Sequence, residues 1–295
     1  MNIEHIVFSG GGPIGLSQSS SINYLLKENY VDIDKIKTVY GVSIGFINAL
    51  CVALKYDFQD IINYQIHRPW EKIFNIKPST AIFNIYTKKG IFDTDLWEKC
   101  LSPLLLAKNF TIDVTFQELF DSTNIELHGI TTDLNELKTV DISYKTHPNL
   151  KIVDAVHMSC ALPFLFKPAF GDNTLYLDGG TTNNFPLDLC IENSNIENTD
   201  TILAFKNLHN SSFTTILNEN SDITEIFTTI IRKLTNKIHD TNKNTVKYTI
   251  NLYTHGIDVS TMTSLLDKNN RQILLDKGEE YTRLFLEYHS LLNNV

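Results

Sequence analysis

The pentapeptide Gly41-Val42-Ser43-Ile44-Gly45 follows a short apolar run at residues 36–40 and precedes a longer apolar run at residues 46–56. This pattern predicts a strand, a sharp turn and a helix, with Ser43 on the turn. A serine in that position is held away from the sheet with its hydroxyl exposed. The two glycines of the pentapeptide allow the close backbone packing that such a turn needs. Ser43 is therefore the candidate nucleophile.

A second glycine-rich segment lies near the start of the chain. Residues 3–8 (IEHIVF) predict a buried strand that runs directly into Ser9-Gly10-Gly11-Gly12-Pro13-Ile14-Gly15, after which a helix is expected. Successive glycines leave backbone N–H groups unshielded at a helix N-terminus, where they attract negative charge. That charge is either a phosphate or the oxyanion of a tetrahedral intermediate.

The same loop satisfies the pattern G-x-G-x-x-G through Gly10, Gly12 and Gly15, which is typical of dinucleotide-binding proteins. Such proteins need an acidic residue at the end of the second strand, where it holds the ribose. Asp32 and Asp34 lie near the required distance, but they precede the second strand, which ends on the serine turn. A nucleotide-binding protein is therefore the less favoured alternative.

The third informative segment is Tyr176-Leu177-Asp178-Gly179-Gly180, a short predicted strand that ends on an aspartate. Asp178 can project to the same sheet edge as Ser43, because the glycines allow the backbone to turn sharply below it. The alternative is an Asp-Gly turn in which the carboxylate caps its own backbone.

The glycine loop, the serine turn and the Asp-Gly-Gly segment, in this order, resemble the patatin-like phospholipases, a family of lipid acyl hydrolases with a Ser-Asp dyad. The resemblance covers essentially the whole chain, since residues 115–133, 155–168 and 184–186 are similar to the family's segments between and after the motifs. It implies one α/β domain over residues 1–295, with three layers (α/β/α) and a central, mainly parallel sheet.

The resemblance also implies a reaction. Ser43 attacks an ester carbonyl of a glycerophospholipid or related lipid, and Asp178 acts as its base. The oxyanion hole is formed by Gly10, Gly11 and Gly12, while Gly41 and Gly45 support the nucleophile's turn. No cofactor or metal is expected. A Ser-Asp-His triad stays open as an alternative, because four histidines follow Asp178 in the chain: His209, His239, His255 and His289.

Three positions depart from the family's pattern. Ile14 stands where the family usually carries arginine or lysine, and Ile44 and Phe46 stand where it prefers very small residues. We expect them to change head-group contacts or to narrow the acyl pocket. The alternative is that they mark a catalytically silent, lipid-binding relative.

Composition limits the partners. With 295 residues, of which 42% are hydrophobic, the chain can bury the core of one large domain. Its net charge of −9 argues against nucleic acid and provides no long-range attraction to anionic bilayers, so only transient contact with a membrane surface is expected. No signal peptide or membrane-spanning run is evident, and we expect a cytoplasmic protein, peripheral at membranes. The sequence does not indicate an oligomeric state.

Two segments and the cysteines complete the analysis. Residues 68–90 contain aromatic residues and prolines without clear periodicity, and we expect a lid or a packed surface loop. Residues 232–247 form a basic-leaning stretch, interpreted as a solvated helix face and loop, with membrane approach as the alternative. The cysteines lack metal-site spacing and are expected to be buried free thiols: Cys51, Cys100, Cys160 and Cys190.

Overall fold

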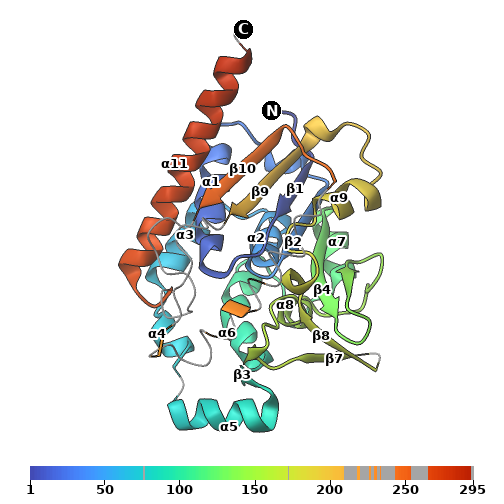
Figure 1. The fold of residues 1–295 in the computed structure, drawn as a ribbon. Coiled ribbons are helices and arrows are strands. Elements are labelled where there is room, and N and C mark those ends of the chain that lie inside the picture. Colours follow the sequence, from blue (N-terminus) through green and yellow to red (C-terminus); the bar gives the residue numbers. More distant parts are fainter. Residues whose placement is uncertain are drawn as a thin grey trace.

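The computed structural model describes residues 1–75, 77–171, 173–208, 218–219, 226, 229–230, 233, 243–253 and 265–293. In this part of the chain, one large sheet is flanked by helices (Figure 1). The predicted three-layer α/β fold with a central, mainly parallel sheet is confirmed.

The parallel part of the sheet has the strand order β10-β9-β1-β2-β4. These strands are β1 (His5–Phe8), β2 (Thr38–Val42), β4 (Glu126–Asp133), β9 (Ile202–Leu208) and β10 (Tyr248–Tyr253). Three antiparallel strands complete the sheet: β5 (Lys138–Ile142) and β8 (Thr174–Asp178) pair with β4, and β7 (Ala169–Gly171) pairs with β8. Strands β4 and β5 form an antiparallel hairpin, with Asp133 paired to Lys138 next to the turn.

Alternate residues of a strand point to opposite faces of a sheet, and β1 contributes buried apolar side chains to the core on both faces. Ile6 and Phe8 belong to the larger hydrophobic cluster, whereas Val7 belongs to a second cluster with Phe185 and Leu187. The second cluster is covered by α9 (Leu187–Asn193). Both faces are therefore buried, which explains why every residue of β1 and β2 is buried and why polar and apolar residues do not alternate along them.

Helices on the side of the larger cluster include α2 (Ile44–Ala53), directly behind the serine turn, and α8 (Ile152–Ser159). The long helix α11 (Lys268–Asn293) packs along α1 (Gly15–Lys27), where Ser17 donates to the Leu274 carbonyl at 2.6 Å. The remaining helices are α3 (Phe58–His67), α4 (Trp70–Ile73), α5 (Pro78–Lys88), α6 (Thr94–Leu106) and α7 (Phe116–Thr123). Thr115 and Glu118 form a capping box at the start of α7.

The segment 68–90 is regular, contrary to its broken sequence pattern. It folds as α4 and α5 and leads into β3 (Gly90–Phe92), which pairs with β6 (Phe164–Phe166) in a separate two-stranded sheet. Proline is at the first turn of α5, where its missing N–H costs no hydrogen bond, and Lys89 in the left-handed conformation ends the helix. The expectation of an irregular loop was wrong because it treated Pro69 and Pro78 as interruptions, whereas they lie at the start of α4 and of α5.

The four cysteines are buried free thiols, as predicted. Most of the basic stretch 232–247 lies outside the described residues. Among the helices that are described, none combines the length and the apolar character that a membrane span requires.

Candidate active site

Strands β2 and β8 meet end to end along one edge of β4. Val42, the last residue of β2, pairs with Ile130, and Asp178, the last residue of β8, pairs with the next residue, Thr131. Since β5 takes the other edge of β4 over the same region, β8 continues along the edge that β2 occupies. β2 runs parallel to β4 and β8 antiparallel, so their carboxyl ends point toward each other. The sheet thus brings Ser43 and Asp178 together across 135 residues of sequence, the difference between their numbers.

Ser43 occupies a strained turn between β2 and α2. Its φ of 53° and ψ of −124° lie outside the regions that a side chain normally allows, at a cost of roughly 1–3 kcal/mol. The flanking glycines are required by space, because a Cβ on Gly41 would lie 2.4 Å from the Gly45 carbonyl oxygen, and one on Gly45 would lie 2.6 Å from the Ser9 carbonyl oxygen. The predicted turn is therefore present, and both of its glycines pack against backbone.

Ser159, the last residue of α8, holds the turn in place. Its Oγ accepts a hydrogen bond from the Ser43 amide at 2.9 Å and donates to the Ile130 carbonyl at 2.6 Å. Its side chain therefore ties the strained residue to β4. Sequence reasoning missed Ser159, because nothing local to it reveals which backbone groups it will meet.

Asp178 is buried at the end of β8. Its Oδ1 accepts from the Gly180 amide at 2.7 Å, while Oδ2 has no partner in the described part of the chain. Burial raises the pKa of Asp178 to about 6, and interactions with the Ser43 side chain and the Gly180 amide only partly oppose this. No hydrogen bond of standard geometry joins Ser43 to the carboxyl group, but the hydroxyl lies near enough to lower its pKa. Such contacts commonly tighten when substrate binds.

The glycine loop contributes fewer free amides than expected. The Gly10 amide donates to the Asn184 carbonyl at 3.0 Å, so it is not available to an oxyanion. The Gly11 and Gly12 amides donate to no acceptor among the described residues. Gly11 (φ 158°) and Gly12 (φ 58°) both adopt backbone conformations that favour glycine. Two of the three predicted donors therefore remain.

Comparison with known proteins identifies the family. A family model described as patatin-like phospholipase matches residues 6–191, more than half of the chain, and this range contains Ser43, Ser159, Asp178 and the glycine loop. The chain belongs to the patatin-like phospholipase family. Members of this family are carboxylic ester hydrolases.

Individual relatives agree with this assignment. The chain is 26% identical over 216 residues to a probable lipid hydrolase of Invertebrate iridescent virus 6, with 69% of each chain covered. It is 27% identical over 206 residues to the triacylglycerol lipase ptl3 of Schizosaccharomyces pombe, covering 61% of this chain and 40% of that protein. The chain spans less than two thirds of the length of several curated relatives that it matches. The structure of VipD from Legionella pneumophila shares the fold (TM-score 0.59, 16% identity), covering 98% of this chain and 67% of that one.

The three departures from the patatin-like pattern are explained by packing. Ile14 is fully buried under the glycine loop, where a Cβ on Gly11 would touch its Cγ2. Phe46 is also fully buried: its ring stacks on Phe116 at 6.3 Å and fills the space over Gly129. Phe46 therefore lies in the core and does not narrow an acyl pocket, contrary to that expectation. Ile44 is half-buried and packs on Gly15.

Other polar groups surround the patatin-like dyad. Cys160 is buried, which raises the pKa of its thiol, and Asp178 raises it further, while the nearby Ser43 side chain opposes both. Of the histidines considered for a triad, His289 is on α11 and packs against Phe285 and Tyr248. The other three lie outside the described residues: His209, His239 and His255.

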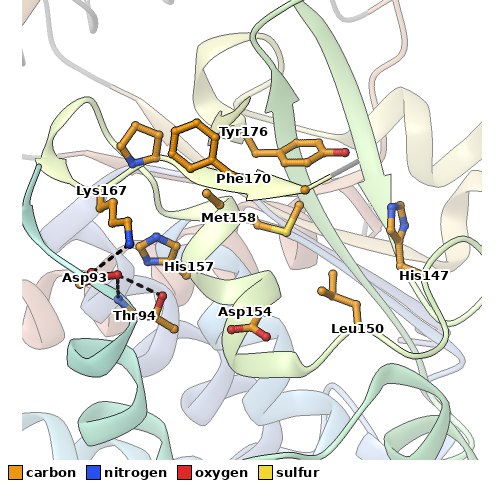
Figure 2. Close-up of a pocket in the computed structure, with 13 residues that line it drawn as sticks. Asp93, Thr94, His147, Leu150, Asp154, His157, Met158, Lys167, Phe170 and Tyr176 are labelled. Carbon is orange, nitrogen blue, oxygen red and sulfur yellow. Dashed lines mark hydrogen bonds and ion pairs between the residues drawn. The ribbon is translucent and has the colours of Figure 1, made fainter. Parts of the chain in front are cut away.

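A cavity of about 420 Å³ lies beside α8 and β8 (Figure 2). Tyr176 lines it and precedes Asp178 by two residues on β8, so their side chains share one face of the sheet, about 7 Å apart. At its side, Lys167 forms an ion pair with Asp93 at 3.2 Å. Apolar side chains complete the lining, among them Leu150, Met158 and Phe170. This mixture of apolar and charged groups is typical of pockets for amphipathic ligands.

Proposed function

We propose that this patatin-like chain hydrolyses fatty-acyl ester bonds of glycerophospholipids, as a phospholipase A or lysophospholipase. Ser43 is the nucleophile and Asp178 the general base. The observation that carries the proposal is the meeting of β2 and β8 on β4, which leaves the strained Ser43 facing a buried carboxyl group.

The proposed reaction has two halves. Ser43 Oγ attacks the acyl carbonyl while its proton passes to Asp178, and the amides of Gly11 and Gly12 stabilise the oxyanion. Collapse of this intermediate breaks the ester bond, and Asp178 returns the proton to the departing alcohol. Water, deprotonated by Asp178, then attacks the acyl-serine and releases the fatty acid, which regenerates the serine hydroxyl.

The environment of Asp178 suits this role. A carboxylate with an ordinary pKa is a weak base for a serine proton, whereas burial raises the pKa of Asp178 to about 6, nearer to neutrality. Because Oδ2 has no partner among the described residues, one oxygen is available for the proton. The Gly180 amide holds the other oxygen and fixes the orientation of the group.

Neutral lipid esters are the second candidate substrate class, because one relative is named a triacylglycerol lipase. A silent lipid-binding relative is a further alternative, but the burial of Ile14 and Phe46 in the core weakens it. The nucleotide-binding alternative loses support, since β2 ends at the serine turn and Asp34 forms an ion pair with Lys55 at 2.7 Å.

A lipid product assay tests the proposal. Mixed vesicles with phosphatidylcholine, lysophosphatidylcholine and triacylglycerol are incubated with wild type, Ser43→Ala and Asp178→Asn, and released fatty acids and remaining lipids are quantified. We expect phospholipid or lysophospholipid to be consumed by wild type alone. Consumption of triacylglycerol alone would favour the neutral-lipid alternative, and release that persists in Ser43→Ala would contradict the assigned nucleophile.

A further inference from the structure

Helix α5 lies at the end of the molecule opposite the two termini (Figure 1). It exposes large apolar side chains. Ile82 is 70% exposed, Phe83 64% and Tyr86 89%. Their spacing of one, three and four residues places them on one face of the helix. The structure describes nothing that covers this face, although exposing it to water is unfavourable.

The opposite side anchors α5 to the protein. Asn84 donates to the Ile91 carbonyl at 3.0 Å, and the chain continues directly into β3. Gly90 lies so close to the Phe166–Lys167 backbone that a Cβ would lie 2.2 Å from it. The exposed apolar face is therefore presented by a helix whose other side is fixed.

The charged residues within the segment that carries α5 are all of one sign. Residues 72–92 contain four lysines, Lys72, Lys77, Lys88 and Lys89, and no acidic residue, although the whole chain has a net charge of −9. The side chains of Lys88 and Lys89 are exposed. An apolar face bordered by lysines complements an anionic lipid surface, where the apolar groups enter the interface and the ammonium groups meet the head groups.

Phe170 connects this helix to the cavity beside the dyad. It is 61% exposed, its ring lies 5.8 Å from Nζ of Lys89, and it also lines the cavity. A bilayer that contacts both α5 and Phe170 would therefore lie next to the cavity.

We propose that α5, together with Phe170, docks the protein on anionic lipid bilayers. This inference rests on the proposed function, because it assigns to the same site a membrane surface as the source of its lipid substrate. The apolar face Ile82, Phe83 and Tyr86 inserts into the interface, and the lysines around it select bilayers with negative charge.

Vesicle co-sedimentation tests this directly. The wild-type chain is mixed with vesicles of phosphatidylcholine alone or with 30% phosphatidylserine, a fraction chosen to give the strong negative surface potential that attracts basic segments. We expect binding to the anionic vesicles, weakened by salt. The variant Ile82→Ser/Phe83→Ser/Tyr86→Ser should lose at least tenfold in partition coefficient, and Lys88→Gln/Lys89→Gln should lose the preference for phosphatidylserine.

A matched control comes from α11, which exposes Leu284, Tyr288 and Leu291 at helical spacing. Beside that stripe three glutamates, Glu279, Glu280 and Glu287, outnumber two basic residues, Lys277 and Arg283, so the stripe is not bordered by net positive charge. Serine at its three apolar positions should leave binding unchanged. Equal vesicle binding by wild type and the α5 variant would overturn the inference. It would also be overturned if wild type formed a dimer and bound no vesicles, while the α5 variant was a monomer.

Hydrolysis of a short, water-soluble ester is measured in parallel and should be the same in wild type and the α5 variant. If vesicle binding depends on α5 but the protein hydrolyses no ester, the proposed function is contradicted and the docking surface is supported. If the protein hydrolyses the ester but its vesicle binding does not depend on α5, the docking surface is contradicted and the proposed function is not.

Discussion

Ser159 Oγ lies 2.9 Å from the amide nitrogen of Ser43, although 116 residues separate the two in sequence. The same oxygen donates to the Ile130 carbonyl, so one hydroxyl bonds both the turn and the strand beside it. Because the backbone of Ser43 is strained, it persists only where its surroundings hold it. Ser159 is such a support, and in the proposed reaction it would act through Ser43.

Ser159→Ala should therefore reduce kcat roughly tenfold or more while changing KM little, because the hydroxyl of Ser43 is no longer fixed. The free energy of unfolding should fall by about 2 kcal/mol, since two buried backbone groups lose their partner. Ser21→Ala is the matched control: Ser21 is also buried and bonds the Ser17 and Gly278 carbonyls, far from the dyad. Equal kcat losses in both variants would show that Ser159 has only a structural role.

The pH dependence of hydrolysis should follow Asp178. A base must be unprotonated, and burial raises the pKa of this carboxyl group to about 6. We expect kcat/KM for a soluble ester to rise with pH and to level off above an apparent pKa near 6, measured over pH 4.5–8.5. If kcat/KM instead fell with an apparent pKa near 4, the base would be an ordinary, exposed carboxylate.

Asp178→Asn should inactivate the protein but stabilise it at high pH. Since its folded-state pKa is raised from 3.8 to about 6, ionised Asp178 destabilises the fold above that pH by about 3 kcal/mol, and this cost disappears as pH falls toward 4. Asparagine carries no charge at any pH. Its melting temperature should exceed that of wild type by several degrees at pH 8 and match it near pH 4. A constant difference across this range would contradict the assigned pKa.

Two glycine substitutions should differ sharply. Gly45→Ala places a Cβ against the backbone oxygens of Ser9 and Phe8, which cannot move away, and we expect a loss of about 3 kcal/mol or failure to fold. Gly12→Ala meets no atom within 4 Å, so only its left-handed backbone costs energy, about 1–2 kcal/mol. Urea unfolding measures both. Similar losses would contradict the packing described around the turn.

A buried ion cluster should make stability depend on pH. Nδ1 of His128 lies 2.9 Å from Asp141 Oδ1, and its ring stacks on Tyr40 at 4.0 Å. Burial lowers the pKa of His128, but Asp141 and Glu126 outweigh it, so the folded-state pKa is raised. This stabilisation is complete below the unfolded pKa of about 6.5 and is lost as pH rises through the folded value.

His128→Gln should remove that dependence. Above pH 6.5 the free energy of unfolding of wild type should fall by up to about 1.4 kcal/mol per pH unit relative to the variant, measured by denaturant titration at several pH values. Parallel curves for the two proteins would mean that His128 is neutral in the fold.

Local features of this site could be predicted from the sequence because their causes are local. The apolar run before Ser43 and the glycines around it specify a strand and a sharp turn, and the Asp-Gly-Gly segment after β8 does the same for Asp178. The order of the motifs along the chain then predicts the patatin-like fold, which is confirmed.

The parts that could not be predicted depend on contacts between distant segments. The Gly10 amide is bonded to the Asn184 carbonyl, and Ser159 reaches Ser43, through pairings that no local pattern encodes. Phe46 lies in the core because Gly129 on the neighbouring strand leaves room for its ring. In α5, apolar residues occupy the exposed positions that are usually polar in a helix. The sequence therefore lacks a clear helical pattern there, and the helix was not predicted.

The central claim is that Ser43 is an activated nucleophile because Asp178 faces it. The most direct measurement is labelling with a fluorophosphonate, followed by peptide mapping of the modified residue in wild type, Ser43→Ala and Asp178→Asn. We predict modification of wild type at Ser43, at a rate that rises with pH through about 6, with none in Ser43→Ala and at least a hundredfold slower labelling in Asp178→Asn. Labelling of Ser43 at an unchanged rate in Asp178→Asn, or no labelling of the folded wild type, would contradict it.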